Sequence, residues 1–361
     1  MKWEKFDTRM KMNNIMKKIL ALGVAGLILF AWTSLAKLAY KQETTQSSIT
    51  VEAVETKSML LENAVAPLQL FQGDDLLETT HPSILSFEEE PWNGYRYWMA
   101  VSPYPEGDDS QENPCIFASN DLENWETPKG LVNPLSPTPE NYEKGIIYNS
   151  DPDLIYNSDT NQLECWWRYV DDKSGIMIIY RKISSDGIHW SQDEIVSLTG
   201  RKTVDYVSFS VLYEDHIYKM WSVGSGYKVQ YTQSKDAKHW DALRTLPIPF
   251  RDSQLRLWHM DMIHTDVGYE MIFVAFNKQT DPTREHMSLY YANTSDNRSI
   301  SEPVLILQPS SGNTWDNDGL YKSTFFKDSN GLYHIIYSGI ALGSHHNIGY
   351  IKWNRQIDDE P

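Results

Sequence analysis

The sequence predicts an all-β protein, a five-bladed β-propeller preceded by an N-terminal signal or anchor segment. Five short segments align with one another, and their third residues fall at positions 83, 153, 210, 261 and 323, in steps of 70, 57, 51 and 62 residues. Repeats of this length, each with three or four strands, are typical of propeller blades. Helical periodicity is almost absent after residue 40. The aligned segments are residues 81–85, 151–155, 208–212, 259–263 and 321–325.

The first 36 residues have the pattern of an export signal. Residues 1–18 contain six Lys or Arg residues, and residues 19–36 contain no charged residue. A basic head followed by an apolar run is typical of a secretion signal peptide or of a transmembrane signal anchor. The small residues at 34–36 suit cleavage, whereas an apolar run of 18 residues also suffices to cross a membrane, so both outcomes stay open. The sequence therefore predicts an exported protein, either secreted or anchored to the outer face of the cytoplasmic membrane.

The charge of the chain limits its partners. The formal net charge is −17, and residues 1–36 carry six basic against two acidic residues, so the remainder is near −21. This balance argues against nucleic acid or anionic lipid as the main partner of the folded part. We expect no nucleic-acid partner, and contact with a membrane only through the N-terminal segment. Residues 37–74, rich in Gln, Thr, Ser and Glu, are predicted to form a linker.

Each aligned segment is followed by a second strand that is rich in aromatic residues: residues 95–101, 163–170, 217–223, 269–276 and 332–338. A third strand then ends in a Ser-x-Asp-x3-Trp turn, which begins at Ser119, Ser184 and Ser234 and, in a degenerate form, at Thr294. The Asp of such a turn bonds the backbone ahead of it, and we expect the Trp to pack on the neighbouring repeat. These turns are interpreted as structural. The propeller is predicted to span residues 75–355, with a tail at 356–361.

The remaining composition adds little about function. The 13 Trp and 21 Tyr residues suit strands and sugar-binding surfaces equally well. Cys115 and Cys165 fall in predicted strands of different repeats. We expect both to be buried free thiols, because two cysteines without further ligands do not make a zinc site.

The aligned segments also share a side-chain pattern. Alternate residues of a strand point to the same face, so the first, third and fifth residues of each segment should face one axis. The first tier is polar and consists of His81, Asp151, Ser208, His259 and Tyr321. The second tier is polar as well, and the third is apolar: Ser83, Asp153, Ser210, Asp261 and Ser323, then Leu85, Ile155, Leu212, Ile263 and Phe325. We therefore expect a central funnel with a polar mouth and a packed throat, and we expect Lys322 to lie outside it.

In these features the chain resembles the five-bladed propeller glycoside hydrolases, the group that includes families 43, 32, 62 and 68. The resemblance covers roughly residues 75–355 and rests on the blade repeat, the Ser-x-Asp-x3-Trp turns and the Pro152-Asp153 pair. It implies three carboxylates at the funnel mouth: an Asp before a Pro in blade one, an Asp in blade two and a Glu in blade three. Asp153 matches the second position, which in those enzymes tunes the protonation of the acid and holds the sugar.

The other two positions depart from that pattern. Blade one has His81 in place of the Asp, and blade three offers only Asp205, displaced in register. Glycoside cleavage needs one carboxyl group to protonate the leaving oxygen and another to act as nucleophile or base. We expect Asp153 and Asp261, facing each other across the funnel, to be the catalytic carboxylates, and Asp151 to modulate them.

Nine further residues are predicted to bind the substrate. Trp258 either stacks on a sugar face or packs on the next blade. The guanidinium of Arg168 either clamps an acidic group of the glycan or neutralises Asp151 and Asp153. The full set of predicted binding residues is His81, Ser83, Glu112, Arg168, Asp205, Ser208, Trp258, His259 and Tyr321.

The sequence thus predicts an extracytoplasmic protein that processes polysaccharide, a glycoside hydrolase or transglycosylase with a divergent active site. The alternative is a non-catalytic carbohydrate-binding propeller that serves cell-surface polysaccharide production. In both cases the partner is a polysaccharide or oligosaccharide. No cofactor and no metal ligand are assigned. A structural calcium ion in the channel, which some members of the group hold, stays open because Asp and His occur at the mouth without a contiguous calcium loop.

Overall fold

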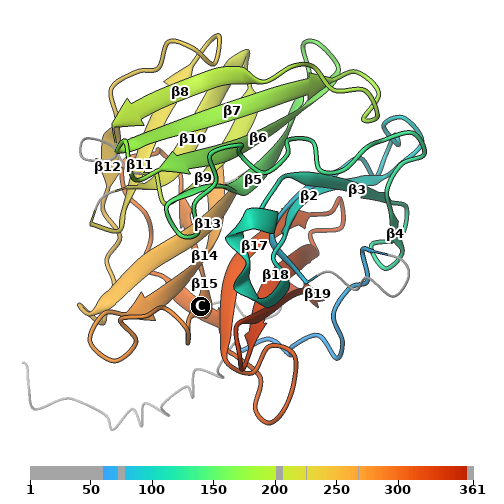
Figure 1. Ribbon diagram of the computed structural model, residues 1–361. Coiled ribbons are helices and arrows are strands. Elements are labelled where there is room, and N and C mark those ends of the chain that lie inside the picture. Colours follow the sequence, from blue (N-terminus) through green and yellow to red (C-terminus); the bar gives the residue numbers. More distant parts are fainter. Residues whose placement is uncertain (1–59, 72–77, 201–205, 225, 267, 356–361) are drawn as a thin grey trace, which may run out of the picture. The chain divides into compact units, whose positions relative to one another are not determined.

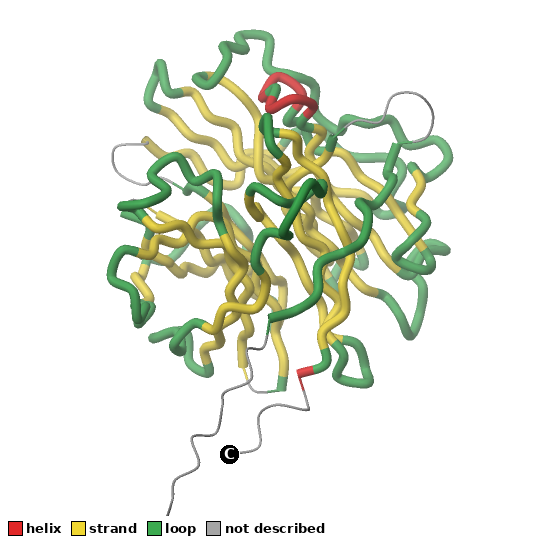
Figure 2. The backbone as a smooth tube through the Cα atoms, turned by 90° about the horizontal axis from the view of Figure 1, so that it is seen from below, coloured by secondary structure: helices red, strands yellow, loops and turns green. Residues whose placement is uncertain are grey.

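Five antiparallel sheets, arranged as the blades of a propeller, make up the part of the chain that the structure describes (Figure 1). The computed structural model describes residues 60–71, 78–200, 206–224, 226–266 and 268–355. The predicted signal segment, the tail and Asp205 lie outside these ranges. Within them no helix is long and apolar enough to cross a membrane. Figure 2 shows the same backbone as strands and loops, with helical colour confined to short segments.

The blades follow one another along the chain, and each is an antiparallel meander. Blade one contains β1 (Thr79–Ser86), β2 (Tyr97–Pro103), β3 (Cys115–Ser119) and β4 (Trp125–Glu126), with the short 3-10 helices η1 (Pro105–Gly107) and η2 (Asp109–Gln111) in the β2–β3 loop. Blade two contains β5 (Ile147–Asn157), β6 (Gln162–Asp171), β7 (Ile176–Ser184) and β8 (Glu194–Gly200). Blade three contains β9 (Ser208–Glu214), β10 (Ile217–Gly224), β11 (Lys228–Ser234) and β12 (Arg244–Leu246). Blade four contains β13 (Leu255–Thr265), β14 (Gly268–Asn277), β15 (Ser288–Thr294) and β16 (Val304–Leu307), and blade five contains β17 (Gly319–Lys327), β18 (Tyr333–Ala341) and β19 (His345–Trp353).

The first strands of the blades surround the central axis. Strands β1, β5, β9, β13 and β17 each contact the next, and β17 contacts β1, so the ring is closed. The five predicted repeats are confirmed, and each second strand begins within two residues of its predicted start. Because neighbouring strands are antiparallel, the loop after each second strand lies at the same end of the ring as the start of each first strand. We call this end the mouth.

The hydrophobic core lies between the blades. Among the described residues, five clusters of buried apolar side chains each draw on two neighbouring blades. The predicted turns take part as expected: Asp121 accepts a 2.7 Å hydrogen bond from the Asn124 amide, and the ring of Trp240 lies 6.1 Å from that of Trp166 in the preceding blade. The structural interpretation of the turns is therefore confirmed.

The turn at Gly187 gives a test of this packing. Gly187 has φ +76, and a Cβ there would overlap the indole of Trp98 in blade one. We expect Gly187→Ala to lower the free energy of unfolding by about 2–4 kcal/mol, through backbone strain and overpacking. The matched control is Gly175→Ala, because Gly175 has φ +65 but open space around it, and about 1 kcal/mol is expected there. If urea denaturation gave the two variants equal losses of unfolding free energy, the contact between Gly187 and Trp98 would contribute nothing to stability.

Residues 60–71 pack on the propeller, although the sequence predicts a linker there. The amide of Leu61 donates to the carbonyl of Ile306 and that of Leu68 to the carbonyl of Ile348, each at 2.8 Å. The segment therefore crosses to β19, the edge strand of three-stranded blade five. Its leucines explain the difference, because they pack on the apolar core between blades one and five. The composition of residues 37–74 is polar on average and hides these few leucines.

The two cysteines behave as predicted. Cys115 on β3 and Cys165 on β6 are free, with 2% and 0% of their surface exposed. Burial raises the pKa of the Cys115 thiol to about 12. Both are therefore unreactive core residues.

A β-bulge near the mouth interrupts four of the five first strands. The register shifts lie between Thr80 and Ser83, Ser150 and Asp153, Leu257 and Met260, and Leu320 and Ser323. In each case two residues of the first strand oppose one residue of the second. Such bulges turn side chains away from the regular alternation. The four bulged pairs are His81 and Pro82, Asp151 and Pro152, Trp258 and His259, and Tyr321 and Lys322.

The bulge in β17 makes the expectation for Lys322 wrong. Its side chain is 1% exposed, and its ammonium donates a 2.8 Å hydrogen bond to the carbonyl of Pro152 on β5. Lys322 therefore lies inside the ring of first strands. Regular alternation would have placed it on the face opposite Tyr321.

Candidate functional site

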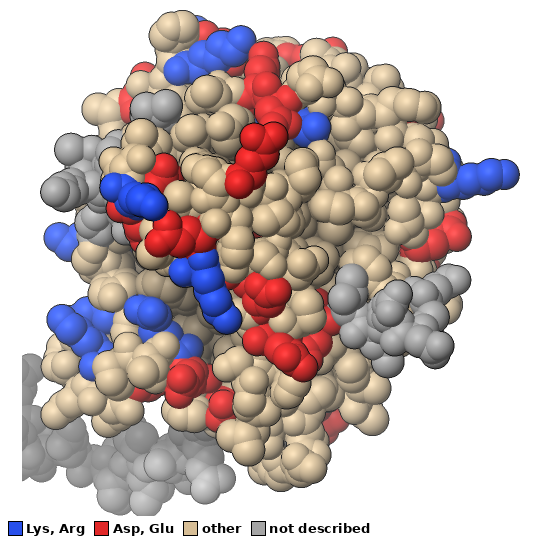
Figure 3. Space-filling view, viewed as in Figure 1, with Lys and Arg blue, Asp and Glu red and all other residues tan. Residues whose placement is uncertain are grey.

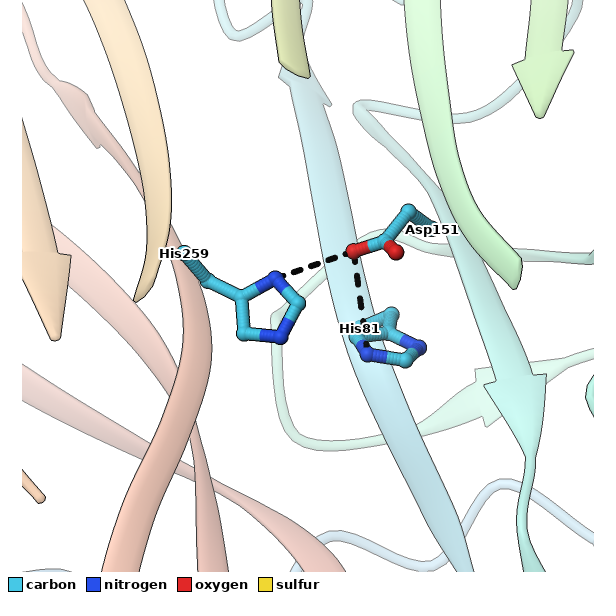
Figure 4. Close-up of side chains that lie close together, drawn as sticks. All are labelled: His81, Asp151 and His259. Atoms are coloured by element: carbon cyan, nitrogen blue, oxygen red, sulfur yellow. Dashed lines mark ion pairs between the residues drawn. The ribbon is translucent and has the colours of Figure 1, made fainter. Parts of the chain in front are cut away.

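Three first-tier side chains converge at the mouth and form what we call the mouth cluster: His81, Asp151 and His259 (Figure 4). Nδ1 of His259 lies 3.0 Å from Oδ1 of Asp151, and Nε2 of His81 lies 3.7 Å from the same oxygen. The three side chains are at most 3% exposed. His81 and Asp151 have φ of 54° and 50°, in the left-handed region that residues with side chains adopt infrequently. The bulges thus aim the three groups at one point.

The polar atoms of the mouth cluster are close but poorly bonded. Nδ1 of His81 and Nδ1 of His259 each face a carboxylate at 3.0 Å, but Nε2 of both rings is buried without a hydrogen-bond partner among the described residues. Buried polar atoms are nearly always satisfied, so unpaired ones point to a missing ligand. One ligand atom from each residue lies within 4.8 Å of the others. Two imidazoles and one carboxylate are a usual donor set for a catalytic zinc or similar divalent ion, and the mouth cluster fits such an ion.

Two further residues hold the mouth cluster in place. The guanidinium of Arg168 lies 3.0 Å from Oδ2 of Asp151 and also donates to the hydroxyl of Ser150 at 2.9 Å. Glu112, from the loop after η2, lies 3.0 Å from Nδ1 of His81. Partners of this kind orient metal ligands and set their tautomers. Of the two roles predicted for Arg168, the structure shows the pairing with Asp151.

The charge state of the mouth cluster follows from burial and close charges. Burial opposes ionisation of Asp151, but the neighbouring His81 and His259 rings and the guanidinium of Arg168 hold its pKa well below the usual value. Burial lowers the pKa of His81 and of His259, so both imidazoles are neutral and able to act as ligands. Burial also raises the pKa of Glu112, against the attraction of His81.

We expect Glu112→Gln to weaken binding of a divalent ion about 10–100-fold, because an amide holds the His81 ring less firmly than a carboxylate. The free energy of unfolding should change little, since glutamine keeps the volume and a hydrogen-bonding oxygen. Isothermal titration with Zn²⁺ measures the affinity, and Glu112→Asp should recover part of it. If the glutamine variant bound the ion with unchanged affinity, Glu112 would have no role in holding the site.

An aromatic wall adjoins the mouth cluster. The ring of Tyr321 lies 4.4 Å from that of His259 and 5.3 Å from that of His81, measured between centroids. His346, at the start of β19, packs edge-on against Tyr321 at 5.3 Å and against Tyr104 at 4.9 Å. Burial lowers the pKa of His346 to about 3, so its imidazole is neutral. The sequence does not single out His346 or Tyr104, because both lie outside the aligned first strands.

Trp258 packs within the protein. Its indole nitrogen donates a 3.3 Å hydrogen bond to the hydroxyl of Tyr321, and the guanidinium of Arg284 lies 4.2 Å from its ring centroid. These contacts cover one face and the polar edge of the indole. Among the other predicted binding residues, Ser208 has a buried hydroxyl with no partner in the described part of the chain.

Asp153 lies below the mouth cluster and joins three blades. Its Oδ1 accepts a 2.8 Å hydrogen bond from the hydroxyl of Ser83, and its Oδ2 accepts a 2.7 Å bond from the Val211 amide. Ser83 in turn accepts from the Leu154 amide at 2.9 Å. Burial raises the pKa of Asp153 to about 7, although the charge of Lys322 opposes this. Both oxygens are thus engaged in holding β1, β5 and β9 together.

Asp261 continues the same ring of hydrogen bonds. Its Oδ1 accepts bonds from the Ser210 hydroxyl at 2.9 Å and from its neighbour's amide, that of Met262, at 2.9 Å. Its Oδ2 accepts bonds from the Thr324 hydroxyl at 2.7 Å and from the Phe325 amide at 3.3 Å. Burial raises the pKa of Asp261.

The circle closes where the Ile84 amide of β1 donates to Thr324 at 3.1 Å. The expected second tier is therefore a closed belt, which we define as Ser83, Asp153, Ser210, Asp261 and Thr324. Thr324 takes the place expected for Ser323, so the sequence alignment of blade five is offset by one residue from the structural one. Asp153 and Asp261 are 3% and 7% exposed, and both are among the residues that line a cavity at the other end of the first strands.

A cavity of about 500 Å³ lies at the other end of the first strands. Its floor includes the half-buried side chains of Leu85, Leu212 and Ile263, so the third tier lines a hollow at this end and does not fill a packed throat. Within the described ranges, no group of metal-ligand atoms like the mouth cluster lies there. We therefore place the candidate chemistry at the mouth, although this cavity is the larger opening described.

Comparisons with known proteins support the fold. No family profile matches the chain. It is 25% identical over 296 residues to the A type blood N-acetyl-alpha-D-galactosamine deacetylase of Flavonifractor plautii, covering 69% of this chain and 38% of that protein. The chain thus spans about two fifths of the length of this curated relative.

Solved structures agree with the architecture. A crystal structure of an N-acetylgalactosamine deacetylase from F. plautii with blood group B trisaccharide superposes with a TM-score of 0.70 at 23% identity, covering 82% of this chain and 96% of that chain. An exo-1,5-alpha-L-arabinanase from a bovine ruminal metagenomic library gives 0.54 at 12% identity, covering 78% and 94%. A GH62 hydrolase in complex with xylotriose gives 0.55 at 12% identity, covering 82% and 98%. The predicted resemblance to five-bladed propeller glycoside hydrolases is confirmed at the level of the fold.

Proposed function

We propose that this chain is a carbohydrate deacetylase, which hydrolyses the acetamide of an N-acetylated sugar in a polysaccharide or oligosaccharide. The observation that carries the proposal is the mouth cluster, whose buried and unpaired ligand atoms suit a divalent ion. Hydrolysis of an amide requires a polarised carbonyl and an activated water. The proposed substrate is still a carbohydrate, as the sequence predicts. The bond that we propose to be hydrolysed is the amide and not the glycosidic bond.

Each residue of the site has a role in this reaction. His81, Asp151 and His259 would hold the ion, which when bound would act as a Lewis acid toward an acyl carbonyl and toward water. Arg168 keeps Asp151 ionised and oriented, and Glu112 fixes the ring of His81. The water supplies a hydroxyl to the acyl carbon and a proton to the departing nitrogen, so the products are acetate and an amine.

The belt supports this choice over glycoside cleavage. A glycosidase needs two carboxyl groups that face the sugar and exchange protons with it. Asp153 and Asp261 instead accept hydrogen bonds from neighbouring blades with all their oxygens. The relative from Flavonifractor plautii bears the name of a deacetylase, which favours the same reaction here.

The deacetylase proposal is tested with a panel of N-acetylated oligosaccharides. We expect the full chain, supplied with Zn²⁺ or Mn²⁺, to release acetate and to create free amines without creating reducing ends. Release of reducing ends without acetate would support a glycoside hydrolase and contradict the proposal. Retention of the glycans without either product would leave the carbohydrate-binding alternative in its place.

We also propose that the propeller acts outside the cytoplasmic membrane, on cell-surface or external polysaccharide. The support is the basic and then apolar sequence of residues 1–36. On the face drawn in Figure 3, Lys and Arg are interspersed with Asp and Glu, which does not favour a nucleic-acid surface. Cell fractionation of the native chain tests the location, and recovery in the cytosol would contradict it.

A further inference from the structure

Tyr321 occupies a special position beside the mouth cluster. It is the first residue of the bulge in β17, and its ring contacts the rings of both histidines of the cluster. The side chain is half-buried, whereas His81, Asp151 and His259 are almost fully buried. Tyr321 therefore adjoins the buried ligands and is more exposed than they are.

The hydrogen bond from Trp258 determines what the phenol can do. An indole nitrogen only donates, so at 3.3 Å the oxygen of Tyr321 is the acceptor. A phenol keeps its own hydrogen at neutral pH and can donate it while accepting another. Among the described residues, no group accepts a hydrogen bond from the Tyr321 hydroxyl. The free donor is thus unused by the protein.

The position of this donor is fixed from both ends. The ring of Tyr321 is held between His259 and His346, with centroids 4.4 and 5.3 Å away. Its oxygen is held by Trp258, which is itself covered by Arg284. Donors held in this way stabilise developing charge without reorganisation, which is the condition for a catalytic oxyanion site.

The two cationic side chains near the mouth cluster are already engaged as donors. Arg168 donates to Ser150 and to backbone carbonyls and pairs with Asp151. Lys322 is buried and donates to the carbonyl of Pro152. Nδ1 of His346 is unpaired but has no exposed surface. Among Arg168, Lys322, His346 and Tyr321, only Tyr321 combines a hydroxyl hydrogen that no described residue accepts with a partly exposed side chain.

We propose that Tyr321 is a catalytic residue that donates a hydrogen bond to the carbonyl oxygen of the scissile acetamide. This inference rests on the proposed deacetylation. As the oxygen of water bonds to the acyl carbon, the carbonyl electron pair moves onto the carbonyl oxygen, and the phenol stabilises that charge. The carbon–nitrogen bond then breaks, the nitrogen leaves with a proton from the water, and Tyr321 keeps its own proton.

The test is Tyr321→Phe, which removes one oxygen and keeps the ring. We expect kcat for acetate release to fall about 100-fold or more, with KM and metal content within about twofold of wild type. A methylphosphonamidate analogue of the substrate, which carries the tetrahedral charge, should bind more weakly by a similar factor. The matched control is Tyr180→Phe on β7, the third strand of blade two, whose ring stacks on Trp167, and its kcat should be unchanged.

The possible failures can be told apart. Wild-type turnover with an equally active Tyr321→Phe variant would overturn the inference and leave the proposed function standing. A loss of kcat that accompanies a loss of bound metal would show a structural role and would also overturn it. A wild-type chain that binds metal but releases no acetate would overturn the proposed function and this inference with it.

Discussion

Asp151→Asn should reduce acetate release about 1,000-fold or more. Asparagine keeps the volume of Asp151 but removes the negative charge that both histidines and Arg168 face. A neutral amide is a weak ligand for a divalent ion, and it leaves the guanidinium of Arg168 without its ionic partner in a buried site. Initial rates of acetate release with saturating Zn²⁺ or Mn²⁺ measure the effect.

The control for this variant is Asp159→Asn. Asp159 also lies close to a histidine, at 2.6 Å from Nδ1 of His216, but on an exposed turn. Its substitution should leave the rate within about twofold of wild type, since exposed ion pairs contribute little. An Asp151→Asn variant that retains a tenth of the wild-type rate would show that the mouth cluster does not carry the chemistry.

Asp261→Ala should lower the free energy of unfolding by about 3–5 kcal/mol. The substitution removes the acceptor of three donors, the hydroxyls of Ser210 and Thr324 and the amide of Phe325. The amide of Met262 keeps a second acceptor, the hydroxyl of Ser210. Each unsatisfied buried donor costs about 1–3 kcal/mol, and partial relaxation reduces the total. The lost hydrogen bonds are those that join the first strands of blades three, four and five.

Urea denaturation followed by tryptophan fluorescence measures this loss. Asp241→Ala is the control, because its side chain is exposed and a change within about 0.5 kcal/mol is expected. The folded fraction of Asp261→Ala should keep most of its acetate release. A stable but inactive variant would contradict the belt role and would restore Asp261 as a carboxylate at the scissile bond.

Much of the architecture could be predicted from the sequence, because it depends on local signals that repeat. The aligned segments beginning at His81, Asp151, Ser208, His259 and Tyr321 became the five first strands. The period-two pattern also placed His81, Asp151 and His259 together in the first tier, and the structure brings these three side chains together. Glu112 and Arg168 were predicted at the mouth from their places near the strand ends, and the structure puts both on the mouth cluster.

The bulges could not be predicted, and they decide the chemistry. One extra residue in a strand changes neither the composition nor the alternating pattern of the sequence. Asp151 and Asp153 are two residues apart, but the bulge gives them different surroundings. Asp151 faces histidines and Asp153 faces the hydroxyls and amides of other blades. The alignment of blade five is also offset by one residue, so Lys322 lies within the ring and Thr324 belongs to the belt.

Removal and return of the metal tests the central claim most directly. The wild-type chain is treated with a chelator, dialysed and titrated with Zn²⁺ or Mn²⁺, while bound metal and acetate release are measured together. We expect no activity after chelation, one tight site per chain, and recovery of acetate release in proportion to its occupancy. Full activity in the metal-free chain, or the absence of a tight site, would contradict the assignment of the mouth cluster.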